Sequence, residues 1–77
     1  MRRELEIQLI REELDRAEKK HPTWPDDPIH AAAIMCEEAG ETIQAALDAH
    51  YAGKDAGNIK TEAIQTGAMA IRLLINL

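Results

Sequence analysis

The chain has 77 residues, of which 14 are acidic and nine are basic, and its net charge at pH 7 is −5. This acidic balance argues against a general nucleic-acid-binding surface and against binding to an anionic membrane, because both need a basic patch. A chain this short forms a single domain, residues 1–77, with a core that usually needs a disulfide, a metal or a partner subunit. Cys36 is the only cysteine, so no intrachain disulfide can form, and we interpret it as a small core residue.

The sequence gives no good match to a secretory signal or to a membrane-spanning helix. The opening Met1-Arg2-Arg3-Glu4 is followed by further acids and does not resemble a secretory signal. The longest apolar-rich stretch, residues 64–77, is too short to span a bilayer and contains Gln65, Arg72 and Asn76. We therefore expect a cytoplasmic protein with no membrane contact.

The first predicted helix covers about residues 3–20. Ile7, Ile10, Leu14 and Ala17 recur at steps of three and four residues, which is the helical period. The other faces mix acidic and basic residues and are typical of a solvated surface. The helix must end before Pro22, because three prolines in the next seven residues cannot continue it.

The second predicted helix covers about residues 28–50. Asp27 fits as its N-cap and Pro28 as its first residue. One side of this helix is apolar and is marked by Ile29, Ala33, Cys36, Ile43 and Leu47. Its alanines and its glycine would permit a close approach of another helix.

The third predicted helix covers about residues 59–76, after a turn that contains two glycines. It is apolar on nearly every side, so it is either buried or packed against a second subunit, and the small size of the chain favours the second subunit. The sequence thus predicts an all-α fold of three helices, which completes a helical bundle by homo-oligomerisation.

Carboxylates without local counter-charges are the main chemical feature of the sequence. Glu37, Glu38 and Glu41 lie within five residues, and no Lys or Arg occurs between His21 and Gly53. Like charges at positions i and i+4 cost a helix about 0.2–0.5 kcal/mol per pair. A hard cation that takes oxygen ligands, such as Mg²⁺, would offset that cost, with Mn²⁺ as the alternative ion. A solvated acidic helix face is the simpler interpretation.

A second pair of side chains could complete a metal site. Glu62 and Gln65 lie three residues apart on the third helix, so they project to similar sides. An antiparallel pairing of the second and third helices could place them opposite Glu38 and Glu41. Magnesium held there would neutralise a polyphosphate and help to activate a water. Alternatively, Glu62 is a favoured acid of a first helical turn and Gln65 is a polar residue of a helix interface.

These residues carry a resemblance to a known family. The chain has Glu37-Glu38-Ala39-Gly40-Glu41, then twenty residues, then Glu62-Ala63-Ile64-Gln65. With His-Pro-Thr-Trp-Pro-Asp-Asp before the second helix and Glu-Ala-Ile-Gln-Thr-Gly-Ala-Met-Ala-Ile-Arg in the third, residues 20–75 resemble a short MazG-like protein. This family belongs to the all-α nucleoside triphosphate pyrophosphohydrolase superfamily, with the pattern E-E-x-x-E, a spacer and E-x-x-D. The departure is Gln65, where the pattern has Asp.

The resemblance implies Mg²⁺-dependent hydrolysis of a nucleoside triphosphate between its α and β phosphates, as a house-cleaning activity on a canonical or damaged nucleotide. It implies that Glu38, Glu41, Glu62 and Gln65 bind the metal. Glu37 would be a further ligand, or would orient or deprotonate the attacking water, and Glu38 also stands at a catalytic position. The family acts as dimers or dimers of dimers, so we expect a homodimer or homotetramer. Because a carboxamide brings no charge, the alternative function is a non-catalytic helical oligomer that binds nucleotides or a partner protein.

Three further residues are candidates for substrate binding. Trp24 could stack on a nucleobase, or it could be the main aromatic residue of the core. Lys54 and Lys60 could contact a triphosphate, or they could be solubilising charges. We expect Arg72, far along the third helix, to form an interface salt bridge instead.

Overall fold

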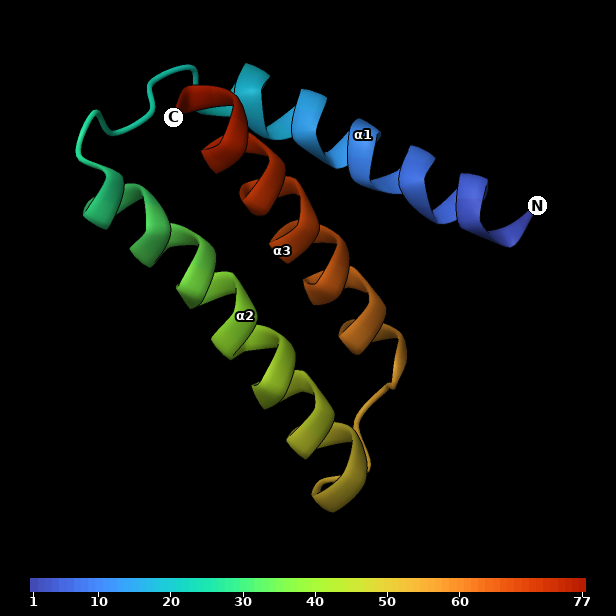
Figure 1. Ribbon diagram of the computed structural model, residues 1–77. Helices are drawn as coiled ribbons and strands as arrows, with labels where there is room; N and C mark the ends of the chain where they lie inside the picture. The colour runs from blue at the N-terminus through green and yellow to red at the C-terminus, as the bar shows by residue number, and fades with distance from the viewer.

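The computed structural model describes residues 1–77 and consists of three α-helices without strands: α1 (Arg2–Lys20), α2 (Pro28–Tyr51) and α3 (Gly57–Asn76). Figure 1 shows α3 between the other two helices, with α2 running antiparallel to it. Both α1 and α2 pack against α3, whereas no Cα atoms of α1 and α2 lie within 8 Å of each other. The predicted all-α fold of three helices is confirmed. None of the three helices combines the length and the apolar composition needed to cross a membrane.

Two aspartates set the starts of α2 and α3. Asp27 Oδ1 accepts a hydrogen bond from the Ile29 N–H at 3.0 Å, with Pro28 as the first helical residue, as the sequence predicts. Asp55 Oδ1 accepts one from the Gly57 N–H at 2.9 Å. Because this bond satisfies an N–H of the first turn, α3 begins at Gly57 and not at the predicted residue 59.

The turn between α2 and α3 depends on one glycine. Gly53 has φ of +66°, a left-handed conformation that side chains with a Cβ disfavour. The Ala52 and Lys54 N–H groups then both donate to the Asp48 carbonyl, at 2.9 and 3.2 Å. The chain thereby reverses direction within residues 52–56 and brings the start of α3 beside the end of α2.

The core is small and lies toward the C-terminal half of α3. Only six of the 77 residues are buried, so the core of a single chain is minimal. Its centre is a cluster of Ala17, Ala68 and Met69, and the half-buried residues around it are Ile10, Leu14, Trp24, Ile34 and Met35. The predicted apolar stripe of α1 therefore contributes Ile10, Leu14 and Ala17, whereas Ile7 is 44% exposed.

The predicted apolar side of α2 points away from the rest of the chain. Its large residues Ile29, Ile43 and Leu47 are exposed, and so is Cys36, so the interpretation of Cys36 as a core residue is wrong. The buried residues of α2 are Ala31 and Ala45, on another side of the helix. Small side chains let the backbones of α2 and α3 approach closely, and this packing leaves the larger apolar residues uncovered.

Arg72 is the one buried charged residue. Its Nη2 donates to the carbonyl oxygens of His21 at 2.5 Å and Thr23 at 3.4 Å, and its guanidinium lies 4.8 Å from the centroid of the Trp24 ring. The predicted interface salt bridge is not formed within the chain, because carbonyls of the α1–α2 connection and an aromatic face surround this cation. Arg72 therefore anchors that connection to α3.

Candidate metal centre

Three carboxylates converge where α2 faces the N-terminal half of α3. One oxygen from each of Glu38, Glu41 and Glu62 lies within 4.8 Å of the other two. Glu38 and Glu62 are half-buried and Glu41 is exposed. The antiparallel pairing of α2 and α3 thus brings the predicted residues together, and the cluster opens toward solvent through Glu41.

A threonine pair fixes the alignment of the two helices beside this cluster. Thr42 Oγ1 and Thr66 Oγ1 lie 3.1 Å apart across the α2–α3 interface. Each threonine follows a cluster glutamate by four residues, and its hydroxyl also lies within hydrogen-bonding distance of that residue's carbonyl, at 3.1 Å for Glu38 and 2.9 Å for Glu62. A slip of one helix along the other would break the contact and separate the carboxylates.

The Gln65 amide lies next to the cluster and contacts two of its three carboxylates. One end of its amide lies 3.1 Å from Glu38 Oε2 and 3.2 Å from Glu62 Oε2. A nitrogen at that position donates to both carboxylates, whereas an oxygen would face only acceptors, so the hydrogen bonding assigns the nitrogen there. Gln65 therefore bridges the two helices through the carboxylates of the cluster.

The cluster contains no neutralising cation. The ion pairs of the chain use Glu6 and Glu13, and none of them involves Glu38, Glu41 or Glu62. Partial burial, followed by the charges of Glu41 and Glu62, raises the pKa of Glu38 above its usual value. A hydrogen bond shared with Glu41, followed by burial, raises the pKa of Glu62. Both shifts have the direction that crowded carboxylates produce.

The donor set fits a hard divalent cation. Three carboxylates and one carboxamide offer only oxygen ligands once the amide presents its oxygen, which is the chemistry that Mg²⁺ prefers. Two ligands on opposite sides of Mg²⁺ are at most about 4.2 Å apart, given bonds of about 2.1 Å. The spread of 4.8 Å is therefore slightly wide, and small side-chain rotations would close it.

The other predicted catalytic residue, Glu37, lies outside the group. It is exposed and its neighbour Glu38 carries the carboxylate that joins the cluster. Successive residues of a helix are rotated by about 100°, so Glu37 and Glu38 face different directions. The roles predicted for Glu37, as a further ligand or as a residue that acts on water, stay predictions.

The residues predicted to bind substrate do not gather at the cluster. Trp24 packs on the core and on Arg72, which is ten residues and hence about 15 Å along α3 from Glu62. Lys60 Nζ pairs with Glu6 Oε1 at 3.4 Å and so links α3 to α1. Lys54 lies exposed in the turn after α2. Their roles in binding stay predictions.

The structure adds residues that the sequence analysis did not single out. A pocket of about 250 Å³ adjoins the cluster on the side of the α2–α3 turn, and its lining includes Glu41, Glu62, Gln44, Asp48 and Asn58. Gln44 Nε2 donates to Asp48 Oδ1 at 2.9 Å. Asp48 follows Glu41 by seven residues, two helical turns, so the helical period could have placed both on one face.

The comparisons with known proteins add nothing to this geometry. No protein-family model, curated protein or solved structure matches the chain. The functional interpretation therefore depends on the residues themselves.

Proposed function

We propose that the chain is a Mg²⁺-dependent, MazG-like pyrophosphohydrolase that cleaves a nucleoside triphosphate to its monophosphate and pyrophosphate. The observation that carries this proposal is the convergence of Glu38, Glu41 and Glu62, which have no cationic partner, within 4.8 Å of one another beside Gln65. These four residues would hold the ion. Bound Mg²⁺, or Mn²⁺ in its place, neutralises phosphate oxygens and lowers the pKa of a bound water.

We assign the acceptance of a proton from the attacking water to Glu38, the cluster carboxylate that stands at a catalytic position of the family pattern. Burial and neighbouring carboxylates raise its pKa in the metal-free protein, and a bound cation would lower that pKa again. The water oxygen forms a bond to the α phosphorus, and the bond from that phosphorus to the bridging oxygen breaks. Pyrophosphate leaves with that oxygen, and the proton of the water passes to Glu38.

Self-association is part of the proposal, because the single chain exposes too much surface. Its accessible area is 5638 Å² for a mass of 8.6 kDa. A compact monomer of this mass exposes about 4,700 Å². The excess of about 900 Å² is close to the roughly 800 Å² that each partner buries in a standard interface.

The exposed apolar side of α2 is the surface that a second copy would cover. Ile29 is 80% exposed, Ile43 63% and Leu47 46%, and Leu74 and Ile75 at the end of α3 are also exposed. Side chains of this kind are normally buried in a small domain. We therefore propose a homodimer or homotetramer in which this side of α2 completes the helical bundle.

A panel of nucleoside triphosphates with Mg²⁺ tests the activity directly. We expect pyrophosphate release from at least one of them by the wild-type protein, and a loss of about 100-fold or more in kcat for Glu38→Gln. Glu41→Gln should weaken the binding of Mn²⁺, measured by electron paramagnetic resonance. Glu18→Gln, an exposed charge on α1, is the matched control and should leave both quantities unchanged.

The same panel can overturn the proposal. Absence of pyrophosphate release from every nucleotide would exclude the hydrolase, and equal activity of Glu38→Gln and Glu18→Gln would exclude the proposed role of Glu38. Substitution of Glu37 by Gln decides separately whether that exposed carboxylate acts on the water.

A specific observation favours a second candidate, a non-catalytic nucleotide-binding or partner-binding oligomer of the same fold. The Gln65 amide already satisfies Glu38 and Glu62 by hydrogen bonding, so the cluster is held together without a metal ion. An inactive wild-type protein that gains pyrophosphate release on Gln65→Asp would support this candidate against the first.

A further inference from the structure

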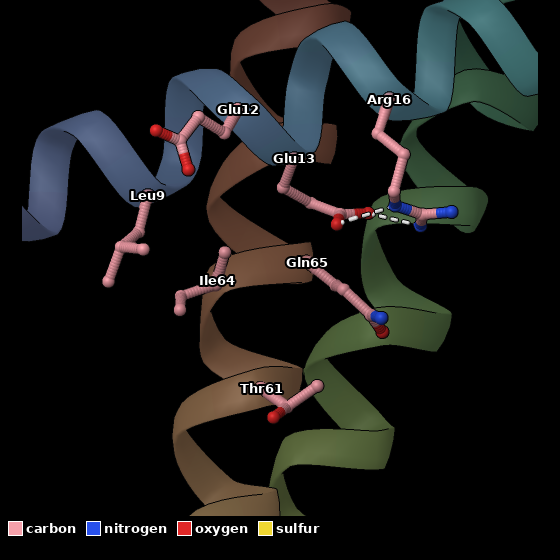
Figure 2. Close-up of a pocket in the computed structure, with 7 residues that line it drawn as sticks. All are labelled: Leu9, Glu12, Glu13, Arg16, Thr61, Ile64 and Gln65. Atoms are coloured by element: carbon pink, nitrogen blue, oxygen red, sulfur yellow. Dashed lines mark hydrogen bonds and ion pairs between the residues drawn. The ribbon is translucent and has the colours of Figure 1, made fainter.

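A second pocket lies on the other side of Gln65, between α1 and α3. Figure 2 shows its lining: Leu9, Glu12, Glu13 and Arg16 from α1 and Thr61, Ile64 and Gln65 from α3. Gln65 thus belongs both to this pocket and, through its amide, to the carboxylate cluster. The pocket and the cluster are therefore neighbours that share one side chain.

The size of the pocket restricts what can enter it. Its volume is about 270 Å³, just below the 300–1,000 Å³ of sites that enclose a whole drug-sized ligand. It therefore accommodates one end of a nucleotide, either the terminal phosphates or the base.

Charge decides between the two ends. The pocket has two carboxylates, Glu12 and Glu13, and one cation, Arg16, which is already paired with Glu13. A terminal pyrophosphate group would add several negative charges beside an unpaired Glu12, whereas a base is neutral. Leu9 and Ile64 supply the apolar surface that the face of a base needs.

At the polar end of the pocket, the hydrogen-bond acceptors of Glu13 lie beside the donors of Arg16. Arg16 Nε donates to Glu13 Oε1 at 2.9 Å and Arg16 Nη2 to Glu13 Oε2 at 2.5 Å, so the pair is held in one plane. The Glu13 side chain is only 16% exposed. Each carboxylate oxygen retains a free lone pair, and the guanidinium retains further N–H groups. Guanine matches this arrangement, because its N1–H and 2-amino donors lie next to its O6 acceptor, and O6 is a common partner of Arg.

We propose that the pocket between α1 and α3 holds the nucleobase of the substrate, and that the Glu13–Arg16 pair selects guanine by its hydrogen-bonding edge. This inference rests on the proposed function, because it assumes that the phosphates lie at the carboxylate cluster. Glu13 and Arg16 are then specificity-determining residues that are not among the four proposed metal ligands. Burial and the other cluster carboxylates raise the pKa of Glu38, and the charge of Glu13 adds a smaller contribution.

Binding of uncleavable nucleotides tests the pocket without relying on catalysis. With Mg²⁺ present, calorimetry should show that the α,β-methylene analogue of dGTP binds the wild-type protein about tenfold or more tightly than the analogue with inosine, which lacks the 2-amino group. Glu13→Gln should remove this preference. Leu9→Trp, which fills the pocket, should weaken both analogues about tenfold and leave Mn²⁺ binding unchanged. Glu18→Gln should retain the wild-type preference.

The outcomes separate this inference from the proposed function. Equal binding of the two analogues to the wild-type protein, an unchanged preference in Glu13→Gln, or no binding of any analogue overturns the guanine pocket. Pyrophosphate release without a base preference leaves the hydrolase standing and removes the pocket. A Glu13-dependent preference without cleavage of any nucleotide removes the hydrolase and leaves the pocket as a binding site.

Discussion

The two halves of α3 carry charged residues in opposite surroundings. Toward its C-terminus, Arg72 is buried, its Nη2 donates to two carbonyl oxygens, and its guanidinium lies over the Trp24 ring, all within the same chain. Toward its N-terminus, Glu62 meets two more carboxylates, and no cation of the chain pairs with them. The cation thus contacts neutral groups that accept its charge, whereas the carboxylates crowd one another without a cation.

The proposed function interprets this difference as one between a structural charge and a metal-binding one. A buried charge that donates to groups of its own chain holds those groups in place, and breaking such contacts destabilises the fold. A group of like charges without a neutralising cation costs stability, and crowded carboxylates of this kind are candidates for a functional site where a ligand supplies the missing charge. Substitutions in the two halves should therefore have opposite effects on the stability of the metal-free protein.

The largest effect on stability is expected in the C-terminal half. Arg72→Met should destabilise the fold by about 2–4 kcal/mol, because the carbonyls of His21 and Thr23 lose a charged donor and the contact with Trp24 is lost. Urea unfolding at fixed protein concentration measures this change. Arg11→Met, an exposed residue of α1, is the matched control and should shift stability by less than about 0.5 kcal/mol. Equal stabilities of the two variants would contradict the anchoring role of Arg72.

The next effect is a pH dependence of stability that arises from the carboxylates beside the N-terminal half of α3. The raised pKa values of Glu38 and Glu62 mean that the folded, metal-free protein binds more protons than the unfolded chain between the ordinary value of 4.5 and the raised values. Metal-free stability should therefore fall as pH rises through this window. Saturating Mg²⁺ should reverse the trend, because protons compete with the ion at a cost of up to about 1.4 kcal/mol per pH unit for each proton displaced.

Unfolding curves between pH 4.5 and 8, with and without Mg²⁺, measure both trends. Parallel pH dependence under the two conditions would show that the carboxylates do not bind the ion.

A smaller effect is expected from the threonine pair that aligns α2 with α3. Thr66→Val keeps the shape of the side chain but removes its bonds to Thr42 and to the Glu62 carbonyl, so we expect a loss of about 1 kcal/mol. Affinity for Mn²⁺ should fall as well, because the helices are less firmly aligned. Thr61→Val, whose hydroxyl bonds only within α3, is the control and should retain that affinity. If Thr66→Val binds Mn²⁺ with unchanged affinity, metal binding does not depend on the alignment of α2 with α3 by the threonine pair.

The smallest effect has the opposite sign from that of Arg72. Glu62→Gln should stabilise the metal-free protein by about 0.5 kcal/mol, because it relieves repulsion among like charges. The same substitution should weaken Mn²⁺ binding, and Glu18→Gln should change neither. A loss of metal-free stability in Glu62→Gln would mean that the carboxylate cluster is structural, like Arg72.

Much of the fold could be predicted from local patterns. Prolines at 22, 25 and 28 and the cap residue Asp27 predicted the break before α2. The spacing showed that an antiparallel pairing of the second and third helices could place Glu62 and Gln65 opposite Glu38 and Glu41, and the family resemblance implied the same set of residues. Helical periodicity is strong in such segments and reports which residues share a face.

Other features depend on contacts between residues far apart in the sequence. Periodicity could not show which face of α2 packs on α3, since alanines form the closer contact and leave Ile43 and Leu47 outside. The carbonyl partners of Arg72 lie about fifty residues earlier in the chain, so no local pattern indicates them. The pairing of Glu13 with Arg16 is local, but its position beside Gln65 follows only from the packing of α1 on α3.

The amide at position 65 has one more consequence. An ionised carboxylate at this position offers only acceptors, whichever way it turns. An amide exchanges a donor for an acceptor when its terminal bond makes a half-turn, a torsion with broad, two-fold preferences. Facing the carboxylates with its nitrogen, Gln65 holds α2 and α3 together without an ion. Facing them with its oxygen, it would offer a ligand atom to a cation in the cluster. The carboxylate cluster could therefore change from a metal-free form to a form ready for a metal ion by a half-turn of the Gln65 amide. Neither helix would need to move.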